Sequence, residues 1–559
     1  GLVQAVEINK SPRADHVEGG LGGFVDIQTR KPLELGKRHM ALSLDATRNE
    51  LANDTAPGVF ALFSDVLSDN LGLMVSAQWD NREFRTDYLE QFGFLGDPRT
   101  VTLNGVEMTG YYPSQLDGEL HLTNRDRLNV SSALQWQPSD RVDVAVDVLF
   151  TDNSTDEARH SRSFRLSQGH QRITEATLSD DNGTGVFTMI STSGAGAFIE
   201  HATEQTTTEA LNLGINLKFQ ATDNLALNVD ASVSDTEAPI TNRDALMRNT
   251  STQMTYRKNG SGRLPSMSSS SPLTDVDHWS VVKQSFQKHV VDDRLSQFRV
   301  DATYEFEGSW LDSIQAGART YRQDRRDRSR YLNSRAFIDQ PIADFGGGVA
   351  FPEDGNFLSG LGMVFPTPIL NPNFDALQQT FSTRADEILS GGGFRTSAQI
   401  NNGVVTFDQD NFNEDLNHDD DGNAIYAMVT FRGALGDTPY SGNLGVRVVD
   451  NSTGSVGEIA VPIDIDFSDP TQGVVIVSPP EFLHIAHDYT EVLPSLNLRF
   501  DLTDFVIRAS VAKVLSRPRF LDLSPRQTVQ TPTRTTRGGN GKLDPTTAVQ
   551  FDLAGEWYF

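Results

Sequence analysis

Residues 18–32 read Glu-Gly-Gly-Leu-Gly-Gly-Phe-Val-Asp-Ile-Gln-Thr-Arg-Lys-Pro, and the interpretation of the whole chain starts from this stretch. Four glycines in the first six positions precede an alternating segment, 24–29, which a Lys-Pro pair ends soon after. Glycine takes positive φ angles and lets the backbone approach another surface closely. On its own, the stretch fits a glycine-rich turn before a β-strand just as well. Its meaning therefore depends on the rest of the sequence.

Long segments after this stretch alternate strictly between apolar and polar residues. In one of them Leu211, Leu213 and Ile215 share one face of an extended chain, and polar or small residues share the other. The same alternation recurs in residues 40–47, 128–136, 142–150, 225–233 and 298–306. These runs last about 9–11 residues, the length at which a tilted strand crosses a bilayer, whereas soluble strands usually have about 5–6. We predict an all-β, transmembrane, antiparallel up-and-down barrel whose apolar faces contact lipid.

The predicted connections alternate between short and long. The short ones are residues 67–70, 138–141, 221–224, 307–309 and 502–505, most of them rich in the Ser, Thr, Asp and Asn that close turns. The long ones are residues 85–123, 152–206, 236–294, 322–421 and 450–487. Structureless loops beyond about 12–15 residues are rare in compact soluble domains. Short turns at one end and long loops at the other are typical of an outer-membrane barrel.

The composition excludes several other classes of protein. No apolar run approaches the ~20 residues of a spanning helix, so a helical membrane protein is excluded. Cysteine is absent, which removes disulfides, Cys-ligated zinc and thiol nucleophiles. The net charge of -28 argues against nucleic-acid binding. Gly-x-Ser-x-Gly, His-Glu-x-x-His and Walker motifs are missing, so we predict no enzyme activity and no cofactor.

The residues around the opening stretch resemble the end of the plug domain of TonB-dependent outer-membrane receptors, in the subfamily of Caulobacter- and Xanthomonas-type bacteria. The shared features are a strand at 6–9, a basic-small-Pro turn, a Glu-Gly-Gly-x-Gly-Gly stretch and a strand ending Thr-Arg-Lys-Pro. The matching plug residues are Lys10, Pro12, Glu18, Gly19, Gly20, Gly22 and Gly23. The resemblance implies that residues 1–35 are the last part of a plug and residues 36–559 belong to a barrel.

Three later blocks resemble the same family, in the family's order. They are a strand at 443–447, a strand pair ending Ser-Arg-Pro at 492–518, and a segment at 539–559 that ends Glu-Trp-Tyr-Phe. The matching barrel residues are Pro494, Ser495, Leu496, Asn497, Arg517, Pro518, Gly539, Asn540, Pro545, Glu556 and Trp557. Gly541 stands where the family usually has proline, which predicts a less rigid loop.

The resemblance also implies that the sequence is a fragment of a longer receptor. The signal peptide, the TonB-binding segment and most of the plug would precede Gly1, and further strands would follow Phe559. The family's barrel has about 22 strands, and we expect roughly two-thirds of them here.

The function implied by the resemblance is active uptake of a scarce, bulky ligand across the outer membrane of a Gram-negative bacterium. The TonB-ExbB-ExbD complex would supply energy through the missing N-terminal region, and lipid and lipopolysaccharide would surround the barrel. Aromatic residues in the long loops favour an oligosaccharide over an iron-siderophore, although hydrophobic packing explains them as well; they are Phe92, Phe94, Tyr111, Tyr112, Phe345 and Phe351. The alternatives are a passive outer-membrane porin and a secreted β-rich glycan-binding protein or adhesin.

Lys10 is the candidate charge of the plug. The resemblance implies that it pairs with carboxylates on the inner barrel wall, and the alternative is a solvated surface lysine. The sequence does not name the partner.

Three further clusters have both a functional and an ordinary interpretation. Residues 417–422 begin like a calcium loop, but Met428 stands where an EF-hand needs its glutamate, so we prefer an acidic turn. His484 and His487 would need a bend in the chain to share a metal ion. A run of arginines could bind lipopolysaccharide phosphates or an anionic substrate, but interleaved Asp residues favour a solvated strand extension; the run is Arg319, Arg322, Arg325, Arg326, Arg328 and Arg330.

Overall fold

The computed structural model describes most of the chain. The described residues are 3–94, 98–166, 172–179, 185–193, 197–249, 251–259, 264–308, 310–334, 340–350, 356–358, 368–383, 414–459, 462–469, 472–478, 481–525, 527–530 and 535–559.

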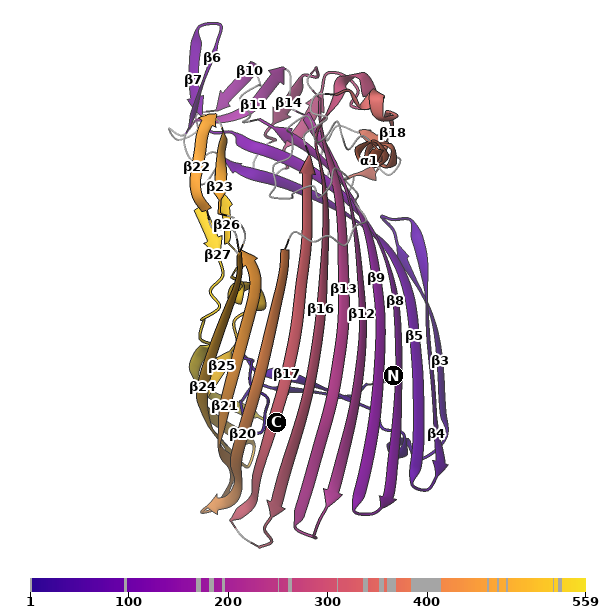
Figure 1. Cartoon of the computed structure of the whole chain (residues 1–559), viewed down its shortest axis with the longest axis vertical. Coiled ribbons are helices and arrows are strands. Elements are labelled where there is room, and N and C mark those ends of the chain that lie inside the picture. The colour runs from indigo at the N-terminus through magenta and orange to yellow at the C-terminus, as the bar shows by residue number, and fades with distance from the viewer. Residues whose placement is uncertain are drawn as a thin grey trace.

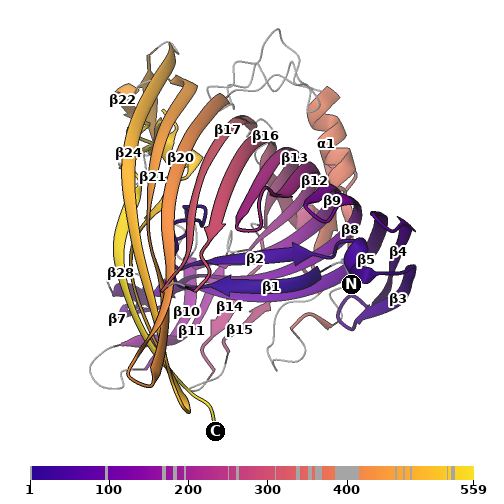
Figure 2. The ribbon, with the colours of Figure 1, turned by 90° about the horizontal axis from the view of Figure 1, so that it is seen from below.

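One fourteen-stranded antiparallel sheet forms the body of the described structure (Figure 1). Its strands follow one another in chain order without a crossover, from β3 at one edge to β28 at the other. They are β3 (His39–Asn49), β4 (Asp54–Ser68), β5 (Leu71–Phe94), β8 (Pro113–Ser139), β9 (Val142–Arg165), β12 (Ala197–Gln220), β13 (Leu225–Asn249), β16 (Trp279–Glu305), β17 (Leu311–Ser334), β20 (Glu414–Leu435), β21 (Thr438–Ile459), β24 (Glu481–Leu502), β25 (Phe505–Ser516) and β28 (Thr546–Trp557). The sheet curves strongly (Figure 2), and its up-and-down order confirms the predicted fold class.

The two faces of the sheet differ as the alternation predicts. On β12, Leu211, Leu213 and Ile215 remain 40–49% exposed on the convex face. On the concave face of the sheet, buried polar residues such as Ser76 on β5 and Gln135 on β8 hydrogen-bond to other side chains. A soluble sheet would bury its apolar face against a second layer, whereas a membrane barrel turns it to lipid. The exposed apolar band therefore fits the membrane interpretation.

The strands are much longer than the alternating sequence predicted. All ten strands of the large sheet from β5 to β24 have 22–27 residues, and 24 residues span about 80 Å at about 3.3 Å per residue. The predicted loop 85–123, for example, contains the end of β5 and the start of β8. Backbone pairing continues above the bilayer, but there the outward side chains face water. Apolar alternation therefore marked only the membrane-spanning part of each strand.

The short connections lie where the sequence predicts them, at the lower end in Figure 1. The turn between β12 and β13 is an example, since Thr222 Oγ1 accepts a hydrogen bond from the Leu225 amide at 3.1 Å. Between β20 and β21, Gly436 has a φ of 64°, which glycine adopts without strain.

The opposite end carries small elements within the long connections. The strands there are β6 (Arg99–Leu103), β7 (Val106–Gly110), β10 (Arg172–Ser179), β11 (Val186–Ser193), β14 (Met254–Arg257), β15 (Ser266–Ser269), β18 (Gly348–Ala350), β19 (Leu370–Pro372), β22 (Pro462–Asp469), β23 (Gln472–Val477), β26 (Gln527–Gln530) and β27 (Thr535–Gly538). The helices are α1 (Phe374–Thr383) and α3 (Phe520–Leu523), with 3-10 turns η2 (Val276–His278) and η3 (Ile342–Phe345). No helix within the described part of the chain is long and apolar enough to span a membrane.

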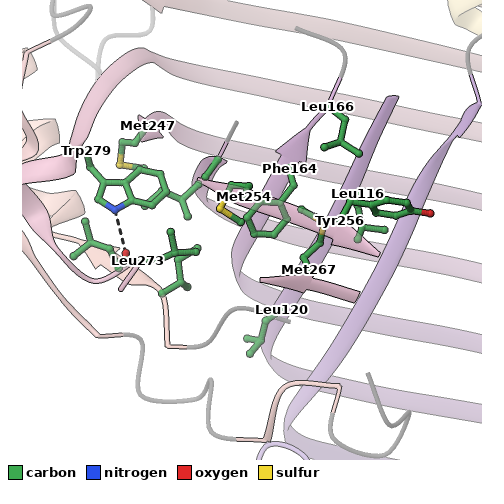
Figure 3. Packing of buried hydrophobic residues seen from close by; sticks show 14 of the residues in the cluster. Leu116, Leu120, Phe164, Leu166, Met247, Met254, Tyr256, Met267, Leu273 and Trp279 are labelled. Carbon is green, nitrogen blue, oxygen red and sulfur yellow. Dashed lines mark hydrogen bonds between the residues drawn. The ribbon is translucent and has the colours of Figure 1, made fainter. Parts of the chain in front are cut away.

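Several of these elements, among them β11, β14, β15, β19, η3 and α1, share a hydrophobic core with the upper ends of the long strands (Figure 3). Trp279 is 1% exposed, and its Nε1 donates a hydrogen bond to the Leu273 carbonyl at 3.0 Å. Met247, Met254 and Phe164 pack in the same cluster. The core lets segments from several connections pack into one structure above the sheet.

A short hairpin lies within the concave side of the sheet (Figure 2). It consists of β1 (Val3–Asn9) and β2 (Phe24–Thr29), which pair antiparallel. The segment 10–23 joins them, and the 3-10 turn η1 (Leu33–Leu35) follows. The fourteen-stranded sheet, which we call the wall, then begins at β3. The glycine-rich stretch 18–32 therefore begins inside the curve of the sheet.

Replacing Leu213 with arginine is expected to prevent insertion, because it would place a charge against lipid at a cost of about 2–4 kcal/mol near the bilayer midplane. The matched control is Asn212→Arg, whose side chain would point to the concave face. Heat-modifiable gel migration of the full-length protein in detergent would measure the folded fraction. Equal folding of both variants would contradict the orientation of β12.

Candidate functional site

The segment 10–23 leaves β1, reaches the concave face of the wall and returns to β2. The backbone conformation of Gly23 allows this return. Gly23 has a φ of 111°, and a Cβ at this position would overlap the Asn9 carbonyl. A residue with a side chain would therefore strain the backbone and separate the two strands. The closure leaves Glu18 at the wall end of the segment.

Glu18 is clamped by three wall arginines, and its side chain is 2% exposed. Arg447 Nε and Arg517 Nη2 each donate a hydrogen bond to its carboxylate at 2.7 Å, one to each oxygen. Arg319 Nη1 lies 3.7 Å from the same carboxylate. We call Glu18 with Arg319, Arg447 and Arg517 the Glu18 clamp.

The arginines of the Glu18 clamp come from separate parts of the wall. Arg319 lies on β17 and Arg447 on β21, both on the concave face by the two-residue period of a strand. Arg517 directly follows β25 and precedes Pro518, which cannot donate a ladder hydrogen bond. The strand therefore ends where Arg517 leaves it to meet Glu18.

Tyr321 lies between two of these guanidinium groups. Its ring centroid is 4.6 Å from the guanidinium carbon of Arg319 and 5.4 Å from that of Arg517. Its hydroxyl donates to Asn451 Oδ1 at 2.6 Å and lies 3.2 Å from Asp420 Oδ1. An aromatic face attracts cations, so the ring supports both arginines from the side.

The electrostatics of the Glu18 clamp favour an ionised carboxylate. Burial by itself would raise the pKa of Glu18, but the charges of Arg447 and Arg517 and the hydrogen bond from Arg517 outweigh it and lower the pKa to about 2. Glu18 therefore stays charged at neutral pH, although its surroundings exclude most water.

Polar and close apolar contacts surround the Glu18 clamp. Asn497 Nδ2 donates to the Pro12 carbonyl at 3.0 Å, and Arg299 Nη2 donates to the Asp15 carbonyl at 3.1 Å. Gln550 donates to the Leu21 carbonyl. Wall side chains thus hold the segment 10–23 by the backbone carbonyls of Pro12, Asp15 and Leu21.

Ala14 packs against the wall where Gly445 leaves room for it. Ala14 is 2% exposed and clusters with Tyr426 and Met428. A Cβ at position 445 would lie 2.6 Å from the Ala14 Cβ, so a larger residue there would push the segment away.

A second attachment lies on the opposite side of the hairpin. Lys31 Nζ contacts Asp147 on β9 at 2.6 Å, and the Leu33 amide donates to Gln135 Oε1 on β8 at 3.1 Å. The Lys31 and Asp147 side chains are 25% and 39% exposed, so water screens this pair far more than the Glu18 clamp.

The plug charge implied by the resemblance, Lys10, lies elsewhere. It is exposed, and it forms no ion pair with any residue that the structure describes. Sequence reasoning named Glu18 and Arg517 only as motif positions and Arg447 only as part of a strand. The signal that the sequence does carry is complementary charge. An acid lies in the glycine-rich stretch, and arginines lie at inward positions of the later segments that resemble the family's barrel.

The motif residues separate into two groups. Glu18, Asn497 and Arg517 meet at the segment 10–23, and Ser495 is buried beside them. The C-terminal motif residues lie apart. The Asn540 amide donates to the Asp522 carbonyl at 2.7 Å, and Glu556 pairs with Arg508 at 2.8 Å.

Around the C-terminal motif, Gly541 is buried against Ile485, where a Cβ would lie 2.7 Å from Ile485 Cγ2. Close packing therefore accounts for a glycine at this position. The lower rigidity expected for this loop stays a prediction.

The expected acidic turn at 417–422 is wrong, because these residues lie within β20. Their side chains alternate between the two faces, so they do not converge on a cation. Asp420 and His418 are buried, and they contact Tyr321 and Ser455 respectively. No cluster of three or more metal-ligating side chains occurs among the described residues.

The other charged clusters are also resolved by strand geometry. His484 and His487 both lie on β24, three residues apart and therefore on opposite faces, and His487 pairs with Asp544 at 2.8 Å. In the arginine run, Arg322 pairs with Asp324 at 3.1 Å and Arg328 with Asp292 at 2.7 Å. Arg322 is 61% exposed, so its pair favours the solvated strand extension at that position, whereas Arg330 near the upper end of β17 is buried.

The loop aromatics give less support to sugar stacking than the sequence suggested. Tyr112 and Phe345 are 5% and 2% exposed in the core of the upper elements, where they cannot lie against a ligand. Phe92 is exposed, at 42%. The side chain of Phe94 and the whole of Phe351 lie outside the described residues.

A curved β-sheet with an apolar convex face, holding a clamped hairpin on its concave side, defines the class of plugged membrane barrels. Residues 242–559 match the family model described as TonB dependent receptor-like, beta-barrel. The chain therefore belongs to the TonB-dependent receptor family, which resides in the outer membrane of Gram-negative bacteria. The finer subfamily assignment stays a prediction.

Comparison with solved structures gave distant likenesses. The ferric-catecholate import receptor Fiu of Escherichia coli K12 has 12% identity and a TM-score of 0.46, over 98% of this chain and 59% of that chain. A mutant of the ferric enterobactin receptor PfeA of Pseudomonas aeruginosa has 9% identity and a TM-score of 0.20, over 91% and 79% of the two chains. The outer membrane transporter YddB of Escherichia coli has 9% identity and a TM-score of 0.18, over 100% and 78%.

The chain thus spans 59% of the length of the Fiu chain. Comparison with curated proteins found no match.

Proposed function

We propose that this chain is part of a receptor that takes up a scarce, bulky ligand across the outer membrane with energy from the TonB-ExbB-ExbD complex. In this proposal residues 1–35 are the last part of the plug and residues 36–559 belong to the barrel. The observation that carries it is the Glu18 clamp, because a buried ion pair between the hairpin and the wall is a contact that can hold a movable stopper in place.

The arrangement suits reversible release. Breaking a buried charge pair costs several kcal/mol, because the uncompensated charges stay in a region that excludes water. Thermal motion therefore seldom opens such a contact, but a pulling force applied through the N-terminal side can supply that energy. No bond chemistry is part of this function.

The ligand is proposed only at the level of two classes. An iron-siderophore and an oligosaccharide are both bulky enough to need a gated path. The burial of Tyr112 and Phe345 removes part of the reason for preferring the oligosaccharide. The outward apolar band implies contact with membrane lipid, and lipopolysaccharide is the proposed partner above it.

Whole-cell uptake would test the proposal. Cells expressing the full-length receptor, with and without TonB, are supplied with labelled ferric siderophores and labelled oligosaccharides. We expect uptake of one class that is lost without TonB. Uptake that persists without TonB would favour the passive porin, and a protein that is soluble without detergent would favour the secreted glycan-binding alternative.

A further inference from the structure

The Glu18 clamp depends on a side chain that does not touch Glu18. Tyr321 faces the concave side of β17 and is 8% exposed. Its ring contacts the guanidinium groups of Arg319 and Arg517, and its hydroxyl is anchored to Asn451 on β21.

The neighbouring strand is shaped to receive this ring. Gly422 on β20 is the direct cross-strand partner of Tyr321. A Cβ at position 422 would overlap the Tyr321 ring. Glycine within a strand weakens the strand, and it often marks a place where another group approaches closely. The ring lies over Gly422 because this glycine has no side chain.

We propose that Tyr321, seated on Gly422, is the positioning residue of the Glu18 clamp, and that it sets how strongly the wall retains the plug. This inference rests on the proposed function and names a means of its regulation. Arginine has a long, flexible side chain, so two arginines on separate segments lose much rotamer freedom when they converge on one carboxylate. A fixed aromatic face between them restricts the guanidinium groups before Glu18 arrives.

The same placement explains the Gly422 position in the acidic run 417–422. Within the acidic run, this glycine resembles a turn residue. In the structure it has a packing role on a regular strand, and the buried Asp420 beside it lies close to the Tyr321 hydroxyl. Asp420 and Gly422 are therefore parts of one support behind the arginines.

The test uses a full-length receptor in which Ala14→Cys is the one reactive thiol, with any cysteine outside these 559 residues replaced by serine; the 559 residues contain none. Ala14 is buried at the wall, so its thiol reacts only when the segment 10–23 leaves. Gly422→Ala is expected to speed labelling about tenfold. The matched control is Gly214→Ala on β12, where a Cβ would meet nothing within 4 Å, and labelling there should not change.

A pH profile distinguishes positioning from a loss of packing. With the ring displaced, the arginines hold Glu18 less well and lower its pKa less. The acid-induced rise in labelling should therefore still begin near pH 4.5, but it should be smaller and should end at a higher pH than in the parent protein. Tyr321→Leu should behave like Gly422→Ala, and Tyr321→Phe, which keeps the ring, should restore most of the parent profile.

Two results would overturn the inference. One is a Gly422→Ala variant that labels like Gly214→Ala. The other is an acceleration of labelling that is equal at every pH. Neither result bears on uptake, which the TonB-dependence experiment decides separately.

Discussion

Replacing Glu18 with glutamine is expected to release the segment 10–23 from the wall at least about a hundredfold more often. The substitution keeps the size of the side chain but leaves Arg319, Arg447 and Arg517 without a countercharge. Removing one partner of a buried ion pair typically costs about 3–5 kcal/mol, and each 1.4 kcal/mol is a factor of about ten in the opening equilibrium. The effect is large because Glu18 is almost fully buried.

Labelling of the buried Ala14→Cys thiol in the full-length receptor measures this opening directly. Glu7→Gln is the matched control, because Glu7 is exposed on β1 and the substitution removes the same charge from the same hairpin. Lys31→Met offers a graded comparison. It removes the solvent-screened pair with Asp147, so it should change the free energy of opening by less than about 1 kcal/mol. If Glu18→Gln labelled no faster than Glu7→Gln, the Glu18 clamp would not retain the segment.

Acid is expected to open the same contact between about pH 4.5 and pH 2. The ordinary pKa of the carboxyl is 4.5, and the clamp lowers the pKa of Glu18 to about 2. Because the pKa is lower in the clamped state, the stabilisation is fully present above pH 4.5 and is lost as the pH falls toward 2. The difference corresponds to on the order of 3 kcal/mol.

The measurement is the labelling rate of Ala14→Cys with dithiodipyridine, a disulfide that reacts with thiols in acid. Rates are normalised to the same protein in denaturant, and the rate is expected to rise by up to about tenfold per pH unit within this window. Glu18→Gln removes the titrating group, so its rate should be fast and nearly independent of pH. A wild-type rate that stays constant down to pH 2 would be incompatible with a charged clamp.

The sequence was sufficient for the fold because one physical rule acts on every strand. Lipid demands apolar side chains at alternate positions, so runs such as Leu211 to Ile215 carry the signal wherever the wall crosses the membrane. Above the membrane this demand disappears, and the pairing of backbone groups leaves no comparable pattern in the side chains. The upper halves of the strands were therefore mistaken for loops, and residues 417–422 for a turn.

The site could be predicted only in part, for a related reason. The resemblance marked Glu18, Asn497 and Arg517 as motif positions, but it said nothing of which ones meet. Arg319 and Tyr321 reach the Glu18 clamp through the register between β17 and its neighbours, which depends on the whole meander. The resemblance implied Lys10 as the plug charge that pairs with the wall, whereas the buried carboxylate of Glu18 needs several donors that come from distant segments.

The attachments of residues 10–35 extend across most of the wall. Lys31 and Leu33 contact β9 and β8, the fifth and fourth strands from the β3 edge of the sheet, and the Leu21 carbonyl is held by β28 at the opposite edge. Residues 10–35 therefore join strands that are far apart in the order of the sheet, in addition to the hydrogen bonds between neighbouring strands. Release of these residues would also remove this connection between remote strands.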